Sequence, residues 1–285
     1  GGQYATVSLY KSTASLIVGN LLYKDGVTTL RTISGGVLLK KLRSKGLSTD
    51  RAMAVINPIR IDSQSLFNPN YSYLSYLLPG LVTALVQMII MITSVLIISS
   101  EFTHHSFGEL YSTSGNSIFN IVVGKSIPHL LLHYSTAVGI IGLLFPLFGI
   151  ELHGILLNTL LFMFLFITAV FFMGFLISCM FHEQLLATEL ALFINTPAFI
   201  FSGFTFPLWS MPAMHNYFAQ AIPFTHFLNG FIKIYQMNAP FRYAMPEIKV
   251  LGTFLVVSLV LSFIVLHFQS TSYLAKGNNS VKDNN

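Results

Sequence analysis

Charged residues are scarce in this chain. Asp, Glu, Lys and Arg together make up 9% of its 285 residues, whereas about 25% is usual for a soluble protein. Hydrophobic residues make up 53%, and 26 of the residues are Phe. A soluble domain of this length could not cover its surface with so few charges. The composition therefore excludes an ordinary soluble protein and predicts an integral membrane protein.

Cysteine is nearly absent too, because Cys179 is the only one in the sequence. A disulfide framework and a Cys-rich metal site are therefore excluded. The sequence also lacks a Ser nucleophile elbow, paired catalytic carboxylates and a zinc-protease motif. Gly124-Lys125-Ser126 resembles the end of a phosphate-binding loop, but Phe119 stands where that motif needs its first glycine. We therefore expect the chain to catalyse no reaction and to bind no cofactor or metal itself.

Most of the positive charge lies near the start of the sequence. Residues 1–62 contain nine Lys and Arg and three Asp, so the remaining 223 residues are nearly neutral. Such a basic segment could bind nucleic acid or anionic lipid, but Lys scattered along a helix is more typical of a solvated face. We therefore expect no nucleic acid partner.

The same segment has the pattern of a small water-soluble α/β module. Residues 5–10 and 59–62 alternate between apolar and polar side chains, which is typical of strands with one buried face. Apolar residues at helical spacing predict a helix over 13–45, with Gly46 as its C-terminal cap. The chain starts with Gly and has no apolar run before residue 77, so we expect its true start to be missing.

Beyond this module, long stretches lack charged residues. A helix that spans a bilayer needs about 20 mostly apolar residues, and its backbone groups cannot remain unpaired in lipid. We therefore predict a mainly α protein, with a polytopic bundle of membrane-spanning helices over residues 78–268 and a disordered tail at 269–285. The five predicted spans lie near residues 78–98, 127–148, 155–178, 188–206 and 248–268.

The charge-free stretch between Glu189 and Lys233 is too long for one span and contains several prolines. Pro223 divides residues 211–236 into two apolar segments, each too short to cross a membrane. This pattern predicts a re-entrant or interfacial helical hairpin. The Lys and Arg counts on the two sides of the membrane are nearly equal, so the positive-inside rule leaves the orientation open.

Glu101 directly follows the first predicted span and opens a polar stretch that also contains His104, His105 and Glu109. An ionisable group at the edge of a span is a candidate functional residue. An acidic side chain is equally typical of the first turn of a short helix, where the helix dipole favours it. The two interpretations are compatible.

His129 and His133 are four residues apart and share one helix face, a spacing that can hold a metal ion. No carboxylate or third histidine lies nearby in the sequence, although His104 and His105 could approach from another segment. We favour interfacial histidines near a helix end over a metal site.

The span 155–178 is rich in Phe, and these residues point to different helix faces. That distribution favours lipid-facing filler over the wall of a drug-binding site. Asn158 and Asn195 are better candidates for inward-facing positions, because an amide in lipid seeks a hydrogen-bond partner.

A set of short motifs occurs in an order and spacing that are specific when taken together. The motifs are Leu66-Phe67-Asn68-Pro69, Tyr76-Leu77-Leu78-Pro79-Gly80-Leu81, Glu101, Ser106, Thr113-Ser114, Gly124-Lys125-x-x-Pro128, Gly174-x-x-Ile177-Ser178, Gln184-x-x-Ala187, Ser202-Gly203-Phe204-x-Phe206-Pro207-x-x-x-Met211-Pro212 and Ile222-Pro223-x-Thr225-x-Phe227-Leu228. Over residues 55–270 the chain resembles the membrane subunit of type-2 ABC exporters, in the multidrug-efflux-like branch with a large extracytoplasmic domain after the first span.

The resemblance implies a multi-pass permease of the bacterial inner membrane with six spans, of which the first would be missing here. Residues 1–77 would be part of the α/β extracytoplasmic domain, and residues 99–126 and the tail would lie in the cytoplasm. The implied partners are a separate cytoplasmic ABC ATPase that binds ATP and Mg, a second permease copy or close paralogue, a periplasmic adaptor and membrane lipid.

The resemblance also implies a mechanism, in which the ATPase drives export of an amphipathic or apolar substrate. A short helix from the 99–126 loop would dock into the ATPase, with Glu101, His104, His105 and Glu109 as coupling residues. Gly124, Lys125 and Pro128 would shape the return into the membrane. The hairpin on the outer side would line the exit through Gly203, Phe206, Pro207, Pro212, Pro223 and Thr225.

Two other functions are compatible with the residues. A membrane-anchored envelope receptor would sense a ligand through the soluble module without transport, and it predicts no ATPase partner. A membrane metalloenzyme would use His104, His105, His129 and His133, and it requires bound metal.

Overall fold

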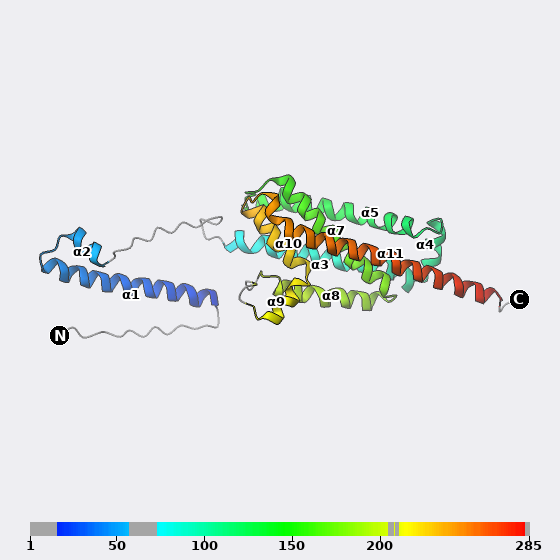
Figure 1. Ribbon diagram of the computed structural model, residues 1–285, viewed down its shortest axis with the longest axis horizontal. Helices are drawn as coiled ribbons and strands as arrows, with labels where there is room; N and C mark the ends of the chain where they lie inside the picture. Colours follow the sequence, from blue (N-terminus) through cyan, green and yellow to red (C-terminus); the bar gives the residue numbers. More distant parts are fainter. Residues whose placement is uncertain (1–15, 57–72, 205–207, 209–210, 283–285) are drawn as a thin grey trace. The chain divides into compact units, whose positions relative to one another are not determined.

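The computed structural model describes residues 16–56, 73–204, 208 and 211–282 (Figure 1). The chain divides into two compact units, residues 1–64 and residues 65–285. Each unit is described by itself below.

The first unit contains α1 (Leu16–Ser44) and α2 (Thr49–Ile56). Gly46 has a φ of +86°, and the Gly46 and Leu47 amides donate to the carbonyls of Arg43 and Leu42. This is a Schellman motif, in which a residue in the left-handed region closes the helix end. Within the described residues, the predicted helix over 13–45 and its cap at Gly46 are confirmed.

The α/β character predicted for this unit is not supported. Residues 16–56 form two helices and a turn, and no strand occurs in the described part of the chain. The predicted strands at residues 5–10 and 59–62 lie outside the described residues. The alternation that suggested them covers only four to six residues, which is a short pattern beside the 29-residue helix that dominates the unit.

In the second unit, five helices are long and apolar enough to span a membrane, as the sequence predicted. Their candidate spans are Leu77–Thr103 in α3 (Tyr73–Thr103), Ile118–Leu147 across α5 (Ile118–Gly139), η1 (Ile140–Leu144) and α6 (Phe145–Leu147), Leu156–Met180 in α7, Gln184–Phe201 in α8, and Phe241–Thr271 across η4 (Phe241–Ala244) and α11 (Met245–Lys282). The second span begins nine residues before its predicted start at residue 127. α11 also includes most of the residues assigned to a tail.

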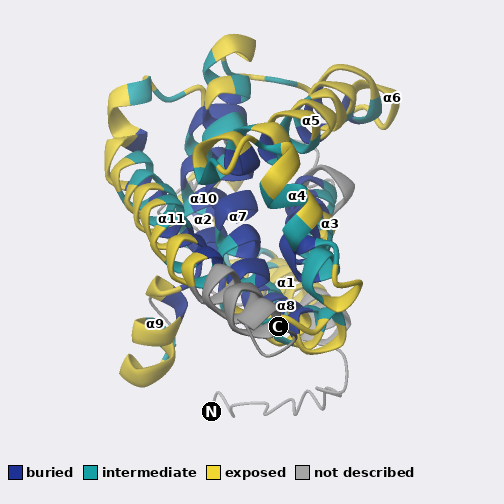
Figure 2. Cartoon of the chain, turned by 90° about the vertical axis from the view of Figure 1, so that its right-hand side faces the viewer, coloured by how far each residue is buried: buried dark blue, intermediate teal, exposed yellow. Residues whose placement is uncertain are grey.

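The helix α7 lies at the centre of this unit and packs mainly against α3 and α11. Figure 2 shows it buried along most of its length, whereas α5 and α11 expose one side. Phe162, Phe166, Phe171 and Phe175 of α7 are each at most 1% exposed. The prediction that these residues are lipid-facing filler was therefore wrong. A helix that is apolar on every face is typical of a position surrounded by other helices.

Small residues let α7 approach α3 closely. A Cβ added to Gly174 would lie 2.7 Å from the Ser94 Cβ and 3.0 Å from the Met91 carbonyl oxygen. One turn further on, the Ser178 hydroxyl accepts backbone N–H bonds from Ile98 and from its neighbour in α3. Such close contacts between small residues are the usual basis of helix association in membranes.

The predicted hairpin consists of α9 (Ala213–Gln220), α10 (Pro223–Phe231) and the π-helical segment η3 (Ile232–Gln236). Pro223 occupies the start of α10, where its missing N–H costs no helical hydrogen bond. The predicted break at Pro223 is thus confirmed. The Tyr235 carbonyl in η3 accepts N–H bonds from His153 and Gly154, which attaches the loop before α7 to the hairpin.

Candidate functional sites

The connection between the first two spans contains a short helix, α4 (Phe107–Thr113). The chain turns back toward α5 at Gly115 and Asn116, which have φ angles of +71° and +59°. The Ser117 side chain then caps α5 by accepting the Asn120 N–H. The short helix expected between residues 99 and 126 is therefore present, at one end of the bundle (Figure 1).

Glu101 is the centre of a polar network at the base of α4. One carboxylate oxygen, Oε1, lies 2.6 Å from the Lys125 ammonium, and the other accepts a 2.5 Å hydrogen bond from the Ser106 hydroxyl. The Glu101 and Lys125 side chains are 17% and 31% exposed. Because the three residues belong to α3, to the start of α4 and to α5, the network holds three elements together.

The other predicted coupling residues make no hydrogen bond or ion pair with this network in the described structure. The His104 Nδ1 lies 2.8 Å from the Ser100 carbonyl oxygen of its own helix, and the His104 side chain is exposed. His105, with a φ of +58°, and Glu109 in α4 are exposed as well. The structure thus joins Glu101 to Lys125 and leaves these three side chains on the surface beside them.

Gly124, Lys125 and Pro128 lie within α5 and not at a turn, because α5 begins at Ile118. Gly124 is exposed, and a Cβ added there would meet nothing within 4 Å. The sequence placed the span start at residue 127 because Lys125 is charged. In the structure α5 continues through Lys125, whose charge is paired with Glu101.

A second set of contacts joins α4 to the turn between α7 and α8. The Phe102 ring stacks on the Phe107 ring of α4 at 4.5 Å and lies 4.2 Å from the His182 ring of the turn. The Thr103 hydroxyl donates to the His182 carbonyl and accepts the Gln184 N–H. Sequence reasoning missed these residues, since their contacts link positions about 80 residues apart.

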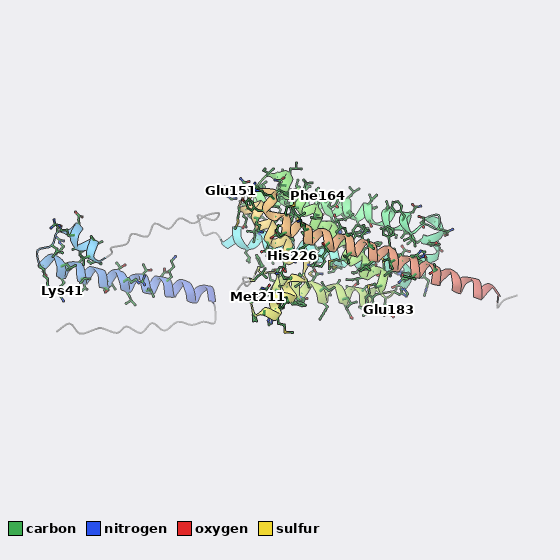
Figure 3. The ribbon with its side chains drawn as sticks, viewed as in Figure 1. Lys41, Glu151, Phe164, Glu183, Met211 and His226 are labelled. Atoms are coloured by element: carbon green, nitrogen blue, oxygen red, sulfur yellow. The ribbon has the colours of Figure 1, made fainter. Side chains whose placement is uncertain are left out.

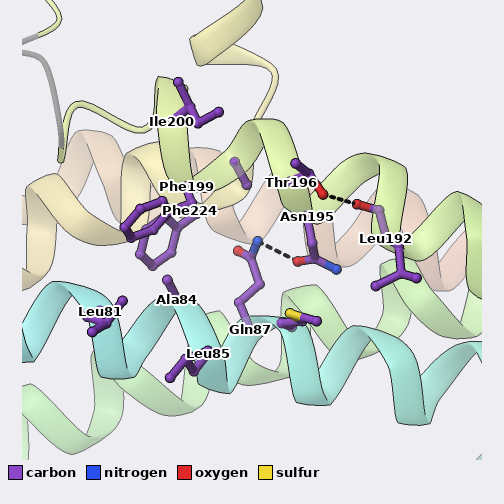
Figure 4. Close-up of a pocket in the computed structure, with 12 residues that line it drawn as sticks. Leu81, Ala84, Leu85, Gln87, Leu192, Asn195, Thr196, Phe199, Ile200 and Phe224 are labelled. Atoms are coloured by element: carbon purple, nitrogen blue, oxygen red, sulfur yellow. Dashed lines mark hydrogen bonds between the residues drawn. The ribbon is translucent and has the colours of Figure 1, made fainter.

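A pocket of about 340 Å³ lies along α3 and α8 (Figure 4). It is lined mainly by apolar residues, namely Leu81, Ala84, Leu85, Met88, Leu192, Ala198, Phe199, Ile200 and Phe224. Its polar residues include Gln87 and Asn195, which are 3% and 7% exposed. The Gln87 Nε2 donates to the Asn195 Oδ1 at 2.9 Å, and the Asn195 Nδ2 donates to the Ala191 carbonyl.

One atom of this amide pair lacks a hydrogen-bond partner. The Gln87 Oε1 is buried without a donor, and Figure 4 shows it turned toward the Phe199 and Phe224 side of the pocket. A buried acceptor without a donor is costly. The other predicted inward amide, Asn158, is half-buried in the first turn of α7 and takes no part in this pocket.

The predicted exit residues gather near the opposite end of the bundle. Gly203 has a φ of +91° after the end of α8, and Pro212 directly precedes α9. Pro223 and Thr225 are buried in α10, and the Thr225 hydroxyl has no hydrogen-bond partner. The remaining two predicted positions, Phe206 and Pro207, lie outside the described residues.

An ion pair that sequence reasoning missed attaches this hairpin to the last span. The Lys233 ammonium of η3 lies 2.6 Å from the Glu247 Oε1 in the first turn of α11. It also donates to the Tyr243 carbonyl at 3.3 Å. Glu247 is 9% exposed, and its second carboxylate oxygen has no partner.

Of the two histidines of α5, His133 is buried in the protein interior and His129 is half-buried. His133 is 5% exposed, and its Nε2 lies 3.2 Å from the Thr93 hydroxyl of α3. His129 lies against the Phe171 ring. Because α5 begins earlier than predicted, these histidines are well inside the helix and not near its end. Among the described residues, no group of three or more His, Cys, Asp or Glu could hold a metal ion.

The five apolar spans, the short helix between the first two and the broken hairpin before the last define a multi-pass membrane protein. A family model described as ABC-2 family transporter protein matches residues 1–264, and the chain belongs to this family. It is therefore a membrane subunit of the ABC permease type, a class that works with an ABC ATPase and is generally not itself catalytic. None of the curated proteins matches the chain.

Proposed function

We propose that this chain is the permease subunit of an ATP-driven exporter in the bacterial inner membrane. It moves an amphipathic or apolar substrate out of the cytoplasm with energy from a separate ATPase subunit. The observation that carries this proposal is the network of Glu101, Lys125 and Ser106 at the base of α4.

The network explains how α4 passes a displacement to the spans. An isolated short helix on a loop would move without effect on its neighbours. Here the Glu101 carboxylate bonds to the residue before α4 and to α5 at once. Charge-assisted hydrogen bonds are the stronger ones, so a movement of α4 on the ATPase acts directly on α3 and α5. Because the ATPase is cytoplasmic, this proposal places residues 99–117 on the cytoplasmic side of the membrane.

The pocket along α3 and α8 supports the proposed substrate class. Its volume of about 340 Å³ and its apolar lining suit a small apolar ligand, or the apolar part of a larger one. The amide pair of Gln87 and Asn195 supplies a few polar contacts that orient such a ligand. The hairpin with Pro223 and Thr225 would then line the exit, and a second permease copy and a periplasmic adaptor would complete the assembly.

The test is ATP-driven transport by the full-length protein, reconstituted in liposomes with its ATPase. We expect Glu101→Ala to reduce substrate-stimulated ATPase activity and transport about tenfold, as a loss of roughly 1.4 kcal/mol of coupling would produce. Glu151→Ala is the matched control, because Glu151 is an exposed carboxylate near the other end of the bundle (Figure 3). Normal coupling in the Glu101→Ala protein would refute the role of Glu101. No ATP-dependent transport by the unaltered protein would refute the function.

A further inference from the structure

We propose that His133 of α5 is a proton-binding site inside the membrane, and that a proton bound there weakens the contact of α5 with Thr93 of α3. The site goes beyond the proposed function, which makes no use of these residues. Three observations support it: His133 lies in the middle of a span, one of its ring nitrogens has no hydrogen-bond partner, and a line of polar side chains leads to it from one end of the bundle.

His133 is an ionisable residue at the centre of an apolar segment. It stands midway along the 30-residue span Ile118–Leu147 and is 5% exposed. Ionisable side chains are rare at such a depth, and those that occur usually belong to an ion or proton site. The described residues bring no set of metal ligands to His133. The ion that its imidazole can bind is therefore the proton.

The contact with Thr93 decides which ring nitrogen of His133 is free. The Thr93 hydroxyl oxygen lies 2.9 Å from the Ile89 carbonyl oxygen and 3.2 Å from the His133 Nε2. A hydroxyl has only one proton to donate, and Thr93 donates it to the carbonyl of its own helix. The His133 Nε2–H therefore donates to Thr93. This leaves the Nδ1 of the neutral ring as an acceptor, for which the described residues provide no donor.

A line of polar side chains leads from the end of the bundle to this nitrogen. Lys125, His129 and His133 follow one another at intervals of four residues, so they lie along one side of α5. The first two are half-buried and the third is buried. Ser126 lies next to this line, and its hydroxyl is buried without a partner. At 1.5 Å per residue the line is about 12 Å long. Because the span contains no titratable residue after Tyr134, the line ends in a binding site and does not cross the membrane.

The helices packed against α5 supply no counter-ion for a charged His133. Their titratable residues are Tyr73, Tyr76 and Glu101 in α3, Glu109 and Tyr111 in α4, Cys179 in α7, and Glu247, Lys249, His267, Tyr273, Lys276 and Lys282 in α11. No described hydrogen bond or ion pair joins any of them to His133. Within α5, Tyr134 bonds to Thr168 of α7, and Lys125 is paired with Glu101.

A proton on the Nδ1 therefore places an unpaired cation in the interior. Burying a charge without a partner is costly, so the charged ring either draws water in along the polar line or moves away from α3. Both outcomes weaken the contact between His133 and Thr93. The loss follows acidification through the range in which histidine titrates, about pH 8 to 5. Because Glu101 and Lys125 join the same two helices, the proton acts on the route that the proposed function assigns to coupling.

Hydrogen–deuterium exchange of the full-length protein in detergent tests the site. Amide exchange around His133 is compared at about pH 8 and about pH 5, after correction for the effect of pH on the chemical exchange rate. In the unaltered protein we expect these amides to open about tenfold more often at the lower pH. His133→Gln keeps an N–H for Thr93 but cannot take the proton, so it should open equally at both. His267→Gln is the matched control, since His267 is exposed, and it should keep the full response.

Thr93→Val provides a second variant, which leaves His133 in place and removes its partner on α3. The amides around His133 should then open often at both pH values, so the response to acid should be smaller than in the unaltered protein. This variant decides the question if His133→Gln does not fold. An undiminished response in either variant, or no response in the unaltered protein, would overturn the inference. Neither ATPase nor substrate is needed, so the site and the proposed function can fail separately.

Discussion

The Glu101 carboxylate lies 2.6 Å from the Lys125 ammonium, although the two residues belong to different helices and are 24 positions apart. Both side chains are partly buried at one end of the bundle. Each charge compensates the other where solvent is limited, and the Ser106 hydroxyl satisfies the second carboxylate oxygen. The pair therefore joins the last turn of α3 to α5.

The first prediction concerns the energy of this pair. Glu101→Ala and Lys125→Ala should each destabilise the protein by about 1–3 kcal/mol, because each leaves a partly buried charge without its partner. The double variant should lose less than the sum, with a coupling energy of about 1 kcal/mol. Unfolding of the detergent-solubilised protein measures all three. Strictly additive losses would show that the two charges do not interact.

The second prediction concerns the contact between α3 and α7. Gly174→Ala should destabilise the protein by about 1–3 kcal/mol, since the new Cβ would meet the Ser94 Cβ and the Met91 backbone. Gly139→Ala is the matched control, because a Cβ there would meet nothing within 4 Å. Its change from Gly to a better helix former should leave stability equal or slightly higher. Similar unfolding temperatures for both variants would contradict the close packing at Gly174.

The third prediction concerns substrate binding. Gln87→Leu removes the amide that faces the pocket between α3 and α8 and leaves the Asn195 oxygen without its donor. For substrates with a hydroxyl or N–H group, the concentration needed for half-maximal ATPase stimulation should rise about tenfold. Substrates without such a donor should be affected less, because they make no hydrogen bond to lose. An equal change for both substrate types would exclude a recognition role for Gln87.

The fourth prediction concerns the ion pair that attaches the hairpin. Lys233→Met leaves the buried Glu247 carboxylate without its cation and should destabilise the protein by about 3 kcal/mol. The Lys233→Met and Glu247→Met double variant should recover most of that loss, because no buried charge remains. Lys249→Met serves as control, since Lys249 is exposed and lies two residues after Glu247 in α11. If the double variant were as unstable as the single one, the pair would not be the cause.

Several features could be predicted from residue patterns because their causes are local. A span requires about 20 apolar residues in a row, and five such stretches became helices. Pro223 begins a new helix after the end of α9, and Gly46 ends α1 because it can adopt a positive φ angle. The bounds were less accurate, since a charged residue such as Lys125 ends an apolar run in the sequence but not necessarily a helix.

The errors have other causes. The Phe residues of α7 were assigned to lipid because their faces differ, and they are buried because other helices surround α7. The histidines were placed near a helix end because the start of α5 was predicted too late. The expected strands lie outside the described residues and stay a prediction, whereas the described part of that unit is helical. The Phe error arose because burial depends on neighbours that are distant in sequence, and the histidine error arose because the start of a helix does not coincide with the start of an apolar run.

The sequence by itself determined that this is a membrane protein, how many apolar spans it contains and where the hairpin breaks. Hydropathy, length and proline geometry act within one segment, so they can be read without the fold. Only the tertiary structure decided that Glu101 meets Lys125, that Gln87 meets Asn195 and that Lys233 meets Glu247. These pairs join segments that are separated along the chain. Because charged residues are scarce, each charged group in the two ion pairs has few other possible partners. The packing of the helices against one another brings these partners together.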